Sequence, residues 1–100
     1  MSLEVVFLRG AESELLAAFS RYEDKIEGLG AEFLVSVDGN LELIKQFPEM
    51  APVYYQEIRR CVVSRFPYGV FYAVESHRIV VHAVLDLRQD PQSIRKRFEH

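Results

Sequence analysis

The hydrophobic pattern of the chain changes its period at Pro48. Before this proline, apolar side chains recur every three or four residues over two long stretches, which is typical of amphipathic helices. After it, β-branched and aromatic residues gather in short runs bounded by turn residues, which is typical of strands. A short β-prone run over 3–8 precedes both parts. A chain of 100 residues is long enough for one core, and we expect 1–100 to form a single domain.

The first part of the chain predicts two antiparallel helices. One apolar stripe marks a helix over 11–29, and a second stripe runs over 33–47. The glycines of 28–30 separate the two stripes, so the helices are expected to form a hairpin. Gly39 and Asn40 lie inside the second helix and cost about 1 kcal/mol or more relative to alanines, so we expect a bend or a break there.

Three more strands are predicted after Pro48. The runs 58–64, 70–75 and 78–85 are rich in β-branched and aromatic residues. Tight turns separate them, so they are expected to form an antiparallel meander. Pro91 ends the sheet, and 93–98 is a short basic tail with room for one or two helical turns.

The order of these elements, β-α-α-β-β-β, predicts an α+β fold. The helical hairpin packs across one face of a small, mainly antiparallel sheet, and the first strand joins that sheet at its edge or in its interior. The opposite face of the sheet is left half open. Because arginines lie in and around the last three strands, this open face is a candidate binding surface.

Charge is distributed unevenly along the chain. The net charge is −3, but residues 1–57 hold 11 acidic and 4 basic side chains, whereas residues 58–100 hold 4 acidic and 8 basic side chains. The acidic balance argues against a protein that grips nucleic acid with its whole surface. The basic part can present a cationic surface to an acidic partner or a phosphate. The alternative is that both parts are ordinary solvated surface.

The sequence holds no apolar run of the length that a membrane span needs and no secretory signal, so we expect a cytoplasmic protein without membrane contact. Cys61, His82 and Asp86 offer the residue types of a nucleophile set, but a cysteine without an activating neighbour in a strand is usually a core residue. His82 is expected to be a packed histidine with one hydrogen bond. The three histidines are too dispersed for a metal site, and we expect no catalytic residue, metal or cofactor.

Several segments in a fixed order resemble the RelE/ParE family of bacterial toxins. They comprise a first strand, a Gly-Leu-Gly link between two helices, and a proline after the second helix. The more specific pieces are Arg59-Arg60, then Arg-Phe-Pro-Tyr-Gly-Val-Phe-Tyr over 65–72, Ala-Val-Leu over 83–85, and Arg-Gln-Asp-Pro over 88–91. The resemblance runs almost from end to end.

This resemblance implies the toxin component of a type II toxin-antitoxin system, also known as a plasmid stabilisation system protein. In such pairs a separately encoded antitoxin wraps over the toxin and neutralises it, and the pair can oligomerise through the antitoxin. The family has two branches. RelE-like members cut mRNA on the ribosome, and ParE-like members lack the cleavage groups and poison DNA gyrase.

The residues at the expected cleavage positions favour the ParE-like branch. RNA cleavage through the 2′-hydroxyl needs a proton acceptor, a proton donor and cations beside the reacting phosphate. The positions where RelE-like members carry such groups match Gly69, Asp86 and Gln89, and no tyrosine follows Tyr72. We therefore expect a gyrase inhibitor that acts by binding. The alternatives are a ribosome-dependent mRNA interferase and a family member without toxicity.

Arginines are the main candidates for partner contact. Arg59 and Arg60 are neighbours in a strand and point to opposite faces, so one of them is expected to contact the partner while the other lies along the helices. Arg65 and Arg88 flank the open face. The remaining candidates are Tyr68, Gln89, Arg95 and Arg97. For each of these side chains the alternative is a solvated surface or packing role.

Overall fold

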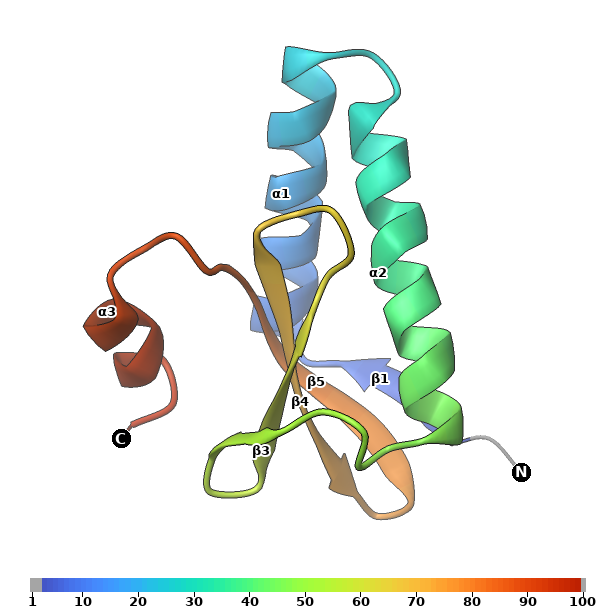
Figure 1. The fold of residues 1–100 in the computed structure, drawn as a ribbon, viewed down its shortest axis with the longest axis vertical. Helices are drawn as coiled ribbons and strands as arrows, with labels where there is room; N and C mark the ends of the chain where they lie inside the picture. Colours follow the sequence, from blue (N-terminus) through green and yellow to red (C-terminus); the bar gives the residue numbers. More distant parts are fainter. Residues whose placement is uncertain (1–2, 100) are drawn as a thin grey trace.

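A five-stranded sheet forms the centre of the computed structural model, which describes residues 3–99 (Figure 1). The strand order is β1-β5-β4-β3-β2. β1 pairs with β5 in parallel, and all other pairs are antiparallel. The strands are β1 (Glu4–Phe7), β2 (Val53–Tyr55), β3 (Ile58–Val62), β4 (Tyr68–Glu75) and β5 (Arg78–Asp86).

Three helices flank this sheet. The long helices α1 (Arg9–Lys25) and α2 (Leu29–Gln46) form an antiparallel hairpin on one face. The short helix α3 (Pro91–Lys96) lies on the other side of the strands (Figure 1). Within residues 3–99, no helix combines the length and the apolar character that crossing a bilayer requires.

The α+β class and the helical hairpin on a mainly antiparallel sheet are confirmed, and β1 takes an edge position. The structure adds one strand that the sequence pattern did not predict. β2 is only three residues long and follows Pro52, so it carries almost no periodic signal. It is held by pairing with β3, where Val53 lies opposite Arg59 and the Arg60 amide donates to the carbonyl of Pro52 at 3.1 Å.

The hairpin link is held by a single carboxylate. Glu23 near the end of α1 accepts the backbone N–H groups of Gly28 at 2.8 Å and Gly30 at 2.9 Å, and so caps the start of α2 from the neighbouring helix. Gly28 has φ of 89°, which favours glycine. Because this cap fixes the turn, α1 ends at Lys25 and α2 begins at Leu29, several residues earlier than the apolar stripes predict.

The expected break at Gly39 and Asn40 is wrong, because α2 is continuous through both residues. The Asn40 side-chain amide donates to the Cys61 sulfur at 2.8 Å and to the Val62 carbonyl at 3.0 Å. These bonds tie the middle of α2 to β3, and they offset the low helix propensity of the Gly-Asn pair. A local sequence pattern does not reveal such a long-range contact.

Both faces of the sheet are buried along residues 68–73 of β4, whereas the sequence led us to expect one face to be half open. Along β4, Val70 and Tyr72 point toward the helical hairpin, whereas Phe71 and Ala73 point toward α3, and all four are fully buried. Ile94 of α3 and Phe98 just after it close the second face. The helix-side core also contains Phe33, Val37, Ile44, Ile79, Val81 and Val84, and the α3-side core also contains Ile58 and Ala83.

Two glycines of α2 are predicted to respond to alanine in opposite directions. A Cβ at Gly30 would lie 2.7 Å from the Phe19 carbonyl oxygen, whereas a Cβ at Gly39 would meet open space. Gly30→Ala should therefore lower the free energy of unfolding by about 1–3 kcal/mol through overpacking between the helices. Gly39→Ala should raise it by up to about 1 kcal/mol. Denaturant unfolding measures both, and equal effects of the two substitutions would contradict the described helix contact.

Candidate partner-binding surface

Arg60 lies on the α3 side of the sheet. It pairs with Phe71 across β3 and β4, and its guanidinium carbon stands 5.4 Å from the centre of the Tyr54 ring. Tyr54 in turn packs edge-on against Phe71 and Phe98, with ring centres 5.2 and 5.8 Å away. The sheet therefore presents Arg60 on an aromatic support at its α3 side.

Gly69 allows Arg60 to lie flat over the sheet. A Cβ at Gly69 would stand 3.0 Å from a methyl group of Leu87 and 3.3 Å from Cγ of Arg60. The space of a side chain at this position is thus filled by Leu87, by the Phe71 ring at 3.2 Å and by the stem of Arg60. Position 69 is where the resemblance leads us to expect a basic residue in an RNA-cleaving relative, and here the neighbouring strand supplies the nearby arginine instead.

A second arginine, on α3, also stands over a tyrosine ring of β2. The guanidinium carbon of Arg95 on α3 lies 4.7 Å from the centre of the Tyr55 ring, and Nε of Arg95 lies 3.5 Å from Glu99. Between β2 and α3 is an open groove of about 420 Å³ lined by Tyr54, Pro91, Gln92, Arg95 and Glu99. We call Tyr54, Tyr55, Arg60 and Arg95 the arginine-tyrosine surface.

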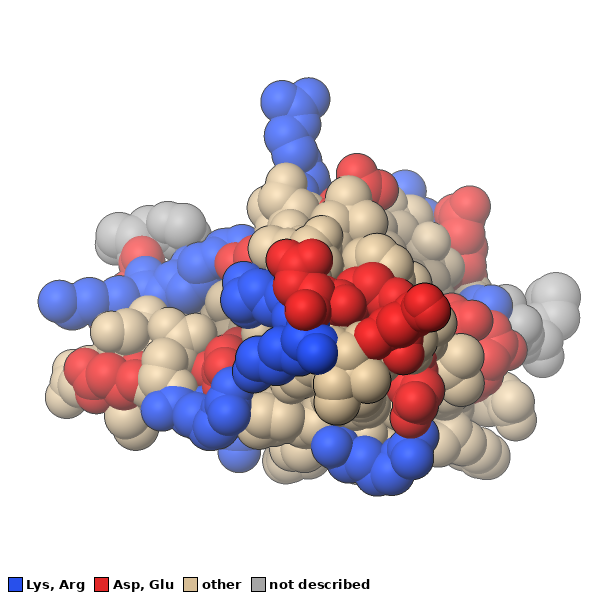
Figure 2. Space-filling model, turned by 90° about the horizontal axis from the view of Figure 1, so that it is seen from above, with Lys and Arg blue, Asp and Glu red and all other residues tan. Residues whose placement is uncertain are grey.

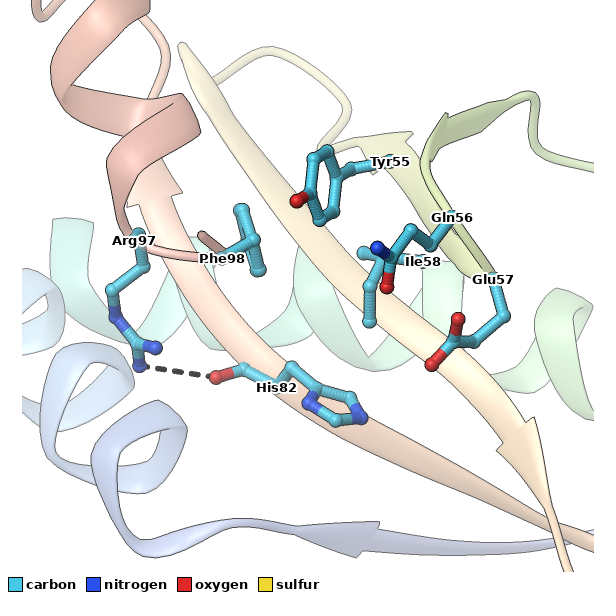
Figure 3. A pocket seen from close by; sticks show the side chains of 7 residues that line it. All are labelled: Tyr55, Gln56, Glu57, Ile58, His82, Arg97 and Phe98. Atoms are coloured by element: carbon cyan, nitrogen blue, oxygen red, sulfur yellow. Dashed lines mark hydrogen bonds between the residues drawn. The ribbon is translucent and has the colours of Figure 1, made fainter. Parts of the chain in front are cut away.

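Arg97 is bound within the molecule. Its Nη2 donates to the His82 carbonyl of β5 at 3.1 Å (Figure 3), and its Nε lies 3.2 Å from the Glu14 carboxylate of α1. Glu14 also accepts the Val84 N–H at 3.1 Å. β1 pairs with β5 only as far as Val81. Beyond that residue, Glu14 and Arg97 satisfy backbone groups of β5 on the side where β1 no longer runs beside it.

Beside Arg97, a hollow of about 170 Å³ lies between the β2–β3 turn, β5 and the residues that follow α3 (Figure 3). Its lining includes Tyr55, Glu57, His82 and Phe98. The His82 ring faces into it, and Nε2 of His82 lies 2.6 Å from the Glu75 carboxylate. His82 is thus half-buried with one side-chain partner, as expected.

Arg59 and Arg60 point to opposite faces, as the strand geometry predicts. Arg59 donates to the carbonyl of Ala51 at 2.7 Å and to that of Glu49 at 3.2 Å, so it ties the loop after α2 to the sheet. The neighbouring Tyr72 hydroxyl donates to the Pro48 carbonyl at 2.8 Å, and burial raises the pKa of this tyrosine. The structure therefore places Arg59 away from Arg60 and Arg95.

A polar cluster surrounds the other end of β4 and β5. Arg88 forms a two-pronged ion pair with Asp86, at 2.7 and 3.0 Å, and this hydrogen bonding lowers the pKa of Asp86 and raises that of Arg88. Tyr68 is buried and accepts a hydrogen bond from Arg21 of α1. Burial, and then the neighbouring Tyr68, raises the pKa of Tyr22.

Arg65 and Gln89 are exposed at the same end of the sheet. Arg65 occupies the β3–β4 turn with φ of 67°, a left-handed conformation that is unfavourable for an arginine. Among residues 3–99, neither side chain has a described hydrogen bond or ion pair. The six predicted arginines thus fall into four places. Arg59 faces the helices, and Arg97 joins α1 to β5. Arg65 and Arg88 lie at the end of the sheet where β4 begins and β5 ends, and Arg60 and Arg95 lie on the arginine-tyrosine surface.

Comparison with known proteins identifies the family. The family model described as the ParE toxin of the type II toxin-antitoxin system, parDE, matches residues 5–91. The chain belongs to the ParE toxin family. A solved structure from the chromosomal ParDE toxin-antitoxin system of P. aeruginosa is similar over 87% of this chain and 98% of that chain, with a TM-score of 0.74 and 13% sequence identity. At that identity the likeness supports the fold. No curated protein matches the chain in sequence.

This ParE family member has no exposed nucleophile set among its described residues. Cys61 is buried and accepts the amide of Asn40, while His82 is paired with Glu75 and Asp86 with Arg88. No group of three metal-ligating side chains gathers within residues 3–99. The geometry around these residues is that of internal pairing.

Sequence reasoning missed several residues that shape this surface. Tyr54 and Tyr55 carried no signal because their contacts with Arg60 and Arg95 arise from pairing between separate elements. Glu14 looked like an ordinary acidic residue of the first helical turns, yet it meets Arg97, 83 positions away in sequence. A search for opposite charges can suggest such a pair only after the fold is known.

The Asp86–Arg88 pair of this ParE chain predicts an acid-dependent contribution to stability. The pKa of Asp86 is below its usual 3.8, so the pair stabilises the fold above the unfolded-state pKa and loses this effect as the pH falls through the lowered value. Arg88→Gln should raise the pKa of Asp86 toward 3.8 and lower stability at neutral pH but not in strong acid. NMR titration of the Asp86 carboxyl measures its pKa, and denaturant unfolding at neutral pH and in strong acid measures the change in stability. Arg65→Gln is the control, and an unchanged Asp86 pKa in Arg88→Gln would contradict the pairing.

Proposed function

We propose that this chain is a toxin that binds and poisons DNA gyrase and that a cognate antitoxin neutralises it. Membership in the ParE family is the observation that carries the proposal. In this account the chain acts in the cytoplasm of a bacterium and holds gyrase on cleaved DNA without breaking a bond itself.

The surroundings of Gly69 support binding over cleavage. Ribosome-dependent cleavage needs acid, base and cationic groups gathered around one phosphate. The position that should carry one of these groups is a buried glycine whose space is filled by Leu87 and the stem of Arg60. Asp86, at another of these positions, is committed to Arg88. Gln89 at the third position has no acid or base to offer.

An apolar groove on the helical hairpin supports the antitoxin partner. It has a volume of about 320 Å³ and lies between α1, α2 and β1, with Phe7, Leu15, Leu34, Val35, Val37, Asp38 and Leu41 around it. Val35 on its rim is 70% exposed. Such a groove suits the apolar face of an amphipathic segment, and Asp38 would favour basic residues beside that face. We call it the helix groove.

The gyrase proposal predicts that purified chain inhibits DNA supercoiling and accumulates cleaved DNA in a reaction with gyrase and ATP. Addition of the cognate antitoxin before gyrase should prevent both effects. A parallel reaction with translating ribosomes should leave mRNA intact in the ribosomal A site. Cut mRNA together with normal supercoiling would contradict the proposal and would favour an mRNA interferase.

The antitoxin proposal predicts that a substitution in the helix groove removes neutralisation by the antitoxin without removing toxicity. Val35→Glu places a charge in the helix groove at an exposed position, so the fold and the toxicity should persist while binding of the antitoxin falls about tenfold or more. Leu16→Glu is the matched control, because Leu16 is 56% exposed on α1 but does not line the groove. Growth upon co-expression of toxin and antitoxin is the readout. Equal rescue of both variants by the antitoxin would contradict this location.

A further inference from the structure

We propose that the arginine-tyrosine surface is the part of the toxin that contacts its target, and that it binds an acidic segment of the target protein. This inference rests on the proposed function and adds a location and a chemistry to it. The surface consists of two arginines, each held over a tyrosine ring. Arg95 and the Tyr54 ring that supports Arg60 both line the open groove between β2 and α3.

The composition of this surface is that of a protein-binding centre. Tyrosine and arginine are enriched among the residues that dominate binding energy at protein interfaces. Tyr54 and Tyr55 are rigid supports because they pack on the α3-side core. A guanidinium that is already held flat over a ring loses less conformational freedom when a partner binds. The two arginines are therefore preorganised.

The arginines have hydrogen-bond donors left for a partner. Within residues 3–99, Arg60 forms no ion pair, and the one ion pair of Arg95 joins its Nε to Glu99 at 3.5 Å. The planar fork of a guanidinium matches a carboxylate in a bidentate arrangement. An acidic segment in the groove meets Arg95 directly, and it reaches Arg60 by passing over Tyr54, which lines the groove and supports that arginine.

Charge around the surface favours an acidic protein segment over nucleic acid. Seen from above, Lys and Arg side chains extend over the left of the molecule, where Figure 1 places α3, with some Asp and Glu side chains among them (Figure 2). Further Asp and Glu side chains gather toward the centre and right, where other Lys and Arg side chains also lie (Figure 2). The chain as a whole carries −3. A long polyanion that followed the basic area would meet these acidic groups and be repelled by them. A short acidic segment avoids this repulsion.

Arg97 positions the surface. α3 has only six residues, and Arg97 follows it directly. Arg97 donates to the His82 carbonyl of β5 and pairs with Glu14 of α1. A Cβ at Gly10 would lie 3.0 Å from Nη2 of Arg97, so the glycine leaves room for this guanidinium against α1. Because Arg95 is two residues away, these contacts of Arg97 hold the end of α3 in place and so help to keep Arg95 against Tyr55.

The test compares two double variants with the same change in net charge. Arg60→Gln with Arg95→Gln removes the two stacked arginines, and Arg9→Gln with Arg78→Gln removes two exposed arginines elsewhere. Growth arrest on induction without antitoxin is measured in cells, and half-inhibition of supercoiling is measured with purified, folded protein. We expect the protein concentration for half-inhibition to rise about tenfold or more in the first double variant. The control double variant should match the wild type.

Equal potency of the two double variants would overturn the inference. If the wild type arrests growth but leaves gyrase unaffected, the proposed function fails, while loss of arrest in the Arg60/Arg95 variant still supports the surface. A wild type without toxicity overturns both. A gel shift with short single-stranded DNA decides the class of partner: tight binding that depends on Arg60 and Arg95 would overturn the acidic-protein assignment.

A second variant separates positioning from direct contact. Arg97→Gln should speed amide hydrogen exchange over 91–99 and weaken inhibition, although Arg60 and Arg95 themselves are not substituted. Arg97→Lys should restore part of the slow exchange and part of the inhibition because it keeps one donor for the His82 carbonyl. Inhibition that stays at the wild-type level while 91–99 exchanges fast would show that the position of α3 is irrelevant, and would overturn the role of Arg95 in the surface.

Discussion

The structure depends on the burial of β4 from both sides. Val70 and Tyr72 pack under the helical hairpin, while Phe71 and Ala73 pack under α3 and the residues after it. A strand buried on both faces needs two covering layers, and a chain of this length has only the six residues of α3 and Phe98 for the second one. The ion pair between Arg97 and Glu14 joins the end of this thin layer to α1.

The same constraint shapes the surface that we propose for target binding. Because α3 covers only the middle of its face, the edge near β2 remains accessible, and the arginines there rest on tyrosines that belong to the core. Gly69 is central to this arrangement, since any larger residue would displace the stem of Arg60 or Leu87. The glycine that removes a basic group from the position expected in RNA-cleaving relatives also makes room for an arginine suited to binding.

Periodicity in the sequence predicted the elements that make many local contacts, namely the helical hairpin and the three longer strands of the meander. It could not predict β2, which exists only because β3 provides backbone partners, or the cover that Ile94 and Phe98 supply. For the candidate site, the opposite directions of Arg59 and Arg60 followed from strand geometry. The supporting tyrosines and the Glu14 partner of Arg97 depend on contacts between distant segments, and no local pattern encodes them.

The central claim is that the toxin meets its target through the α3 side and meets its antitoxin through the helices. Hydrogen exchange of the toxin in complex with gyrase tests this most directly. The account predicts slower exchange over 52–60 and 91–99 and unchanged exchange over 34–41, which belongs to the helix groove. Protection confined to 34–41, or no protection anywhere in the presence of gyrase, would contradict it.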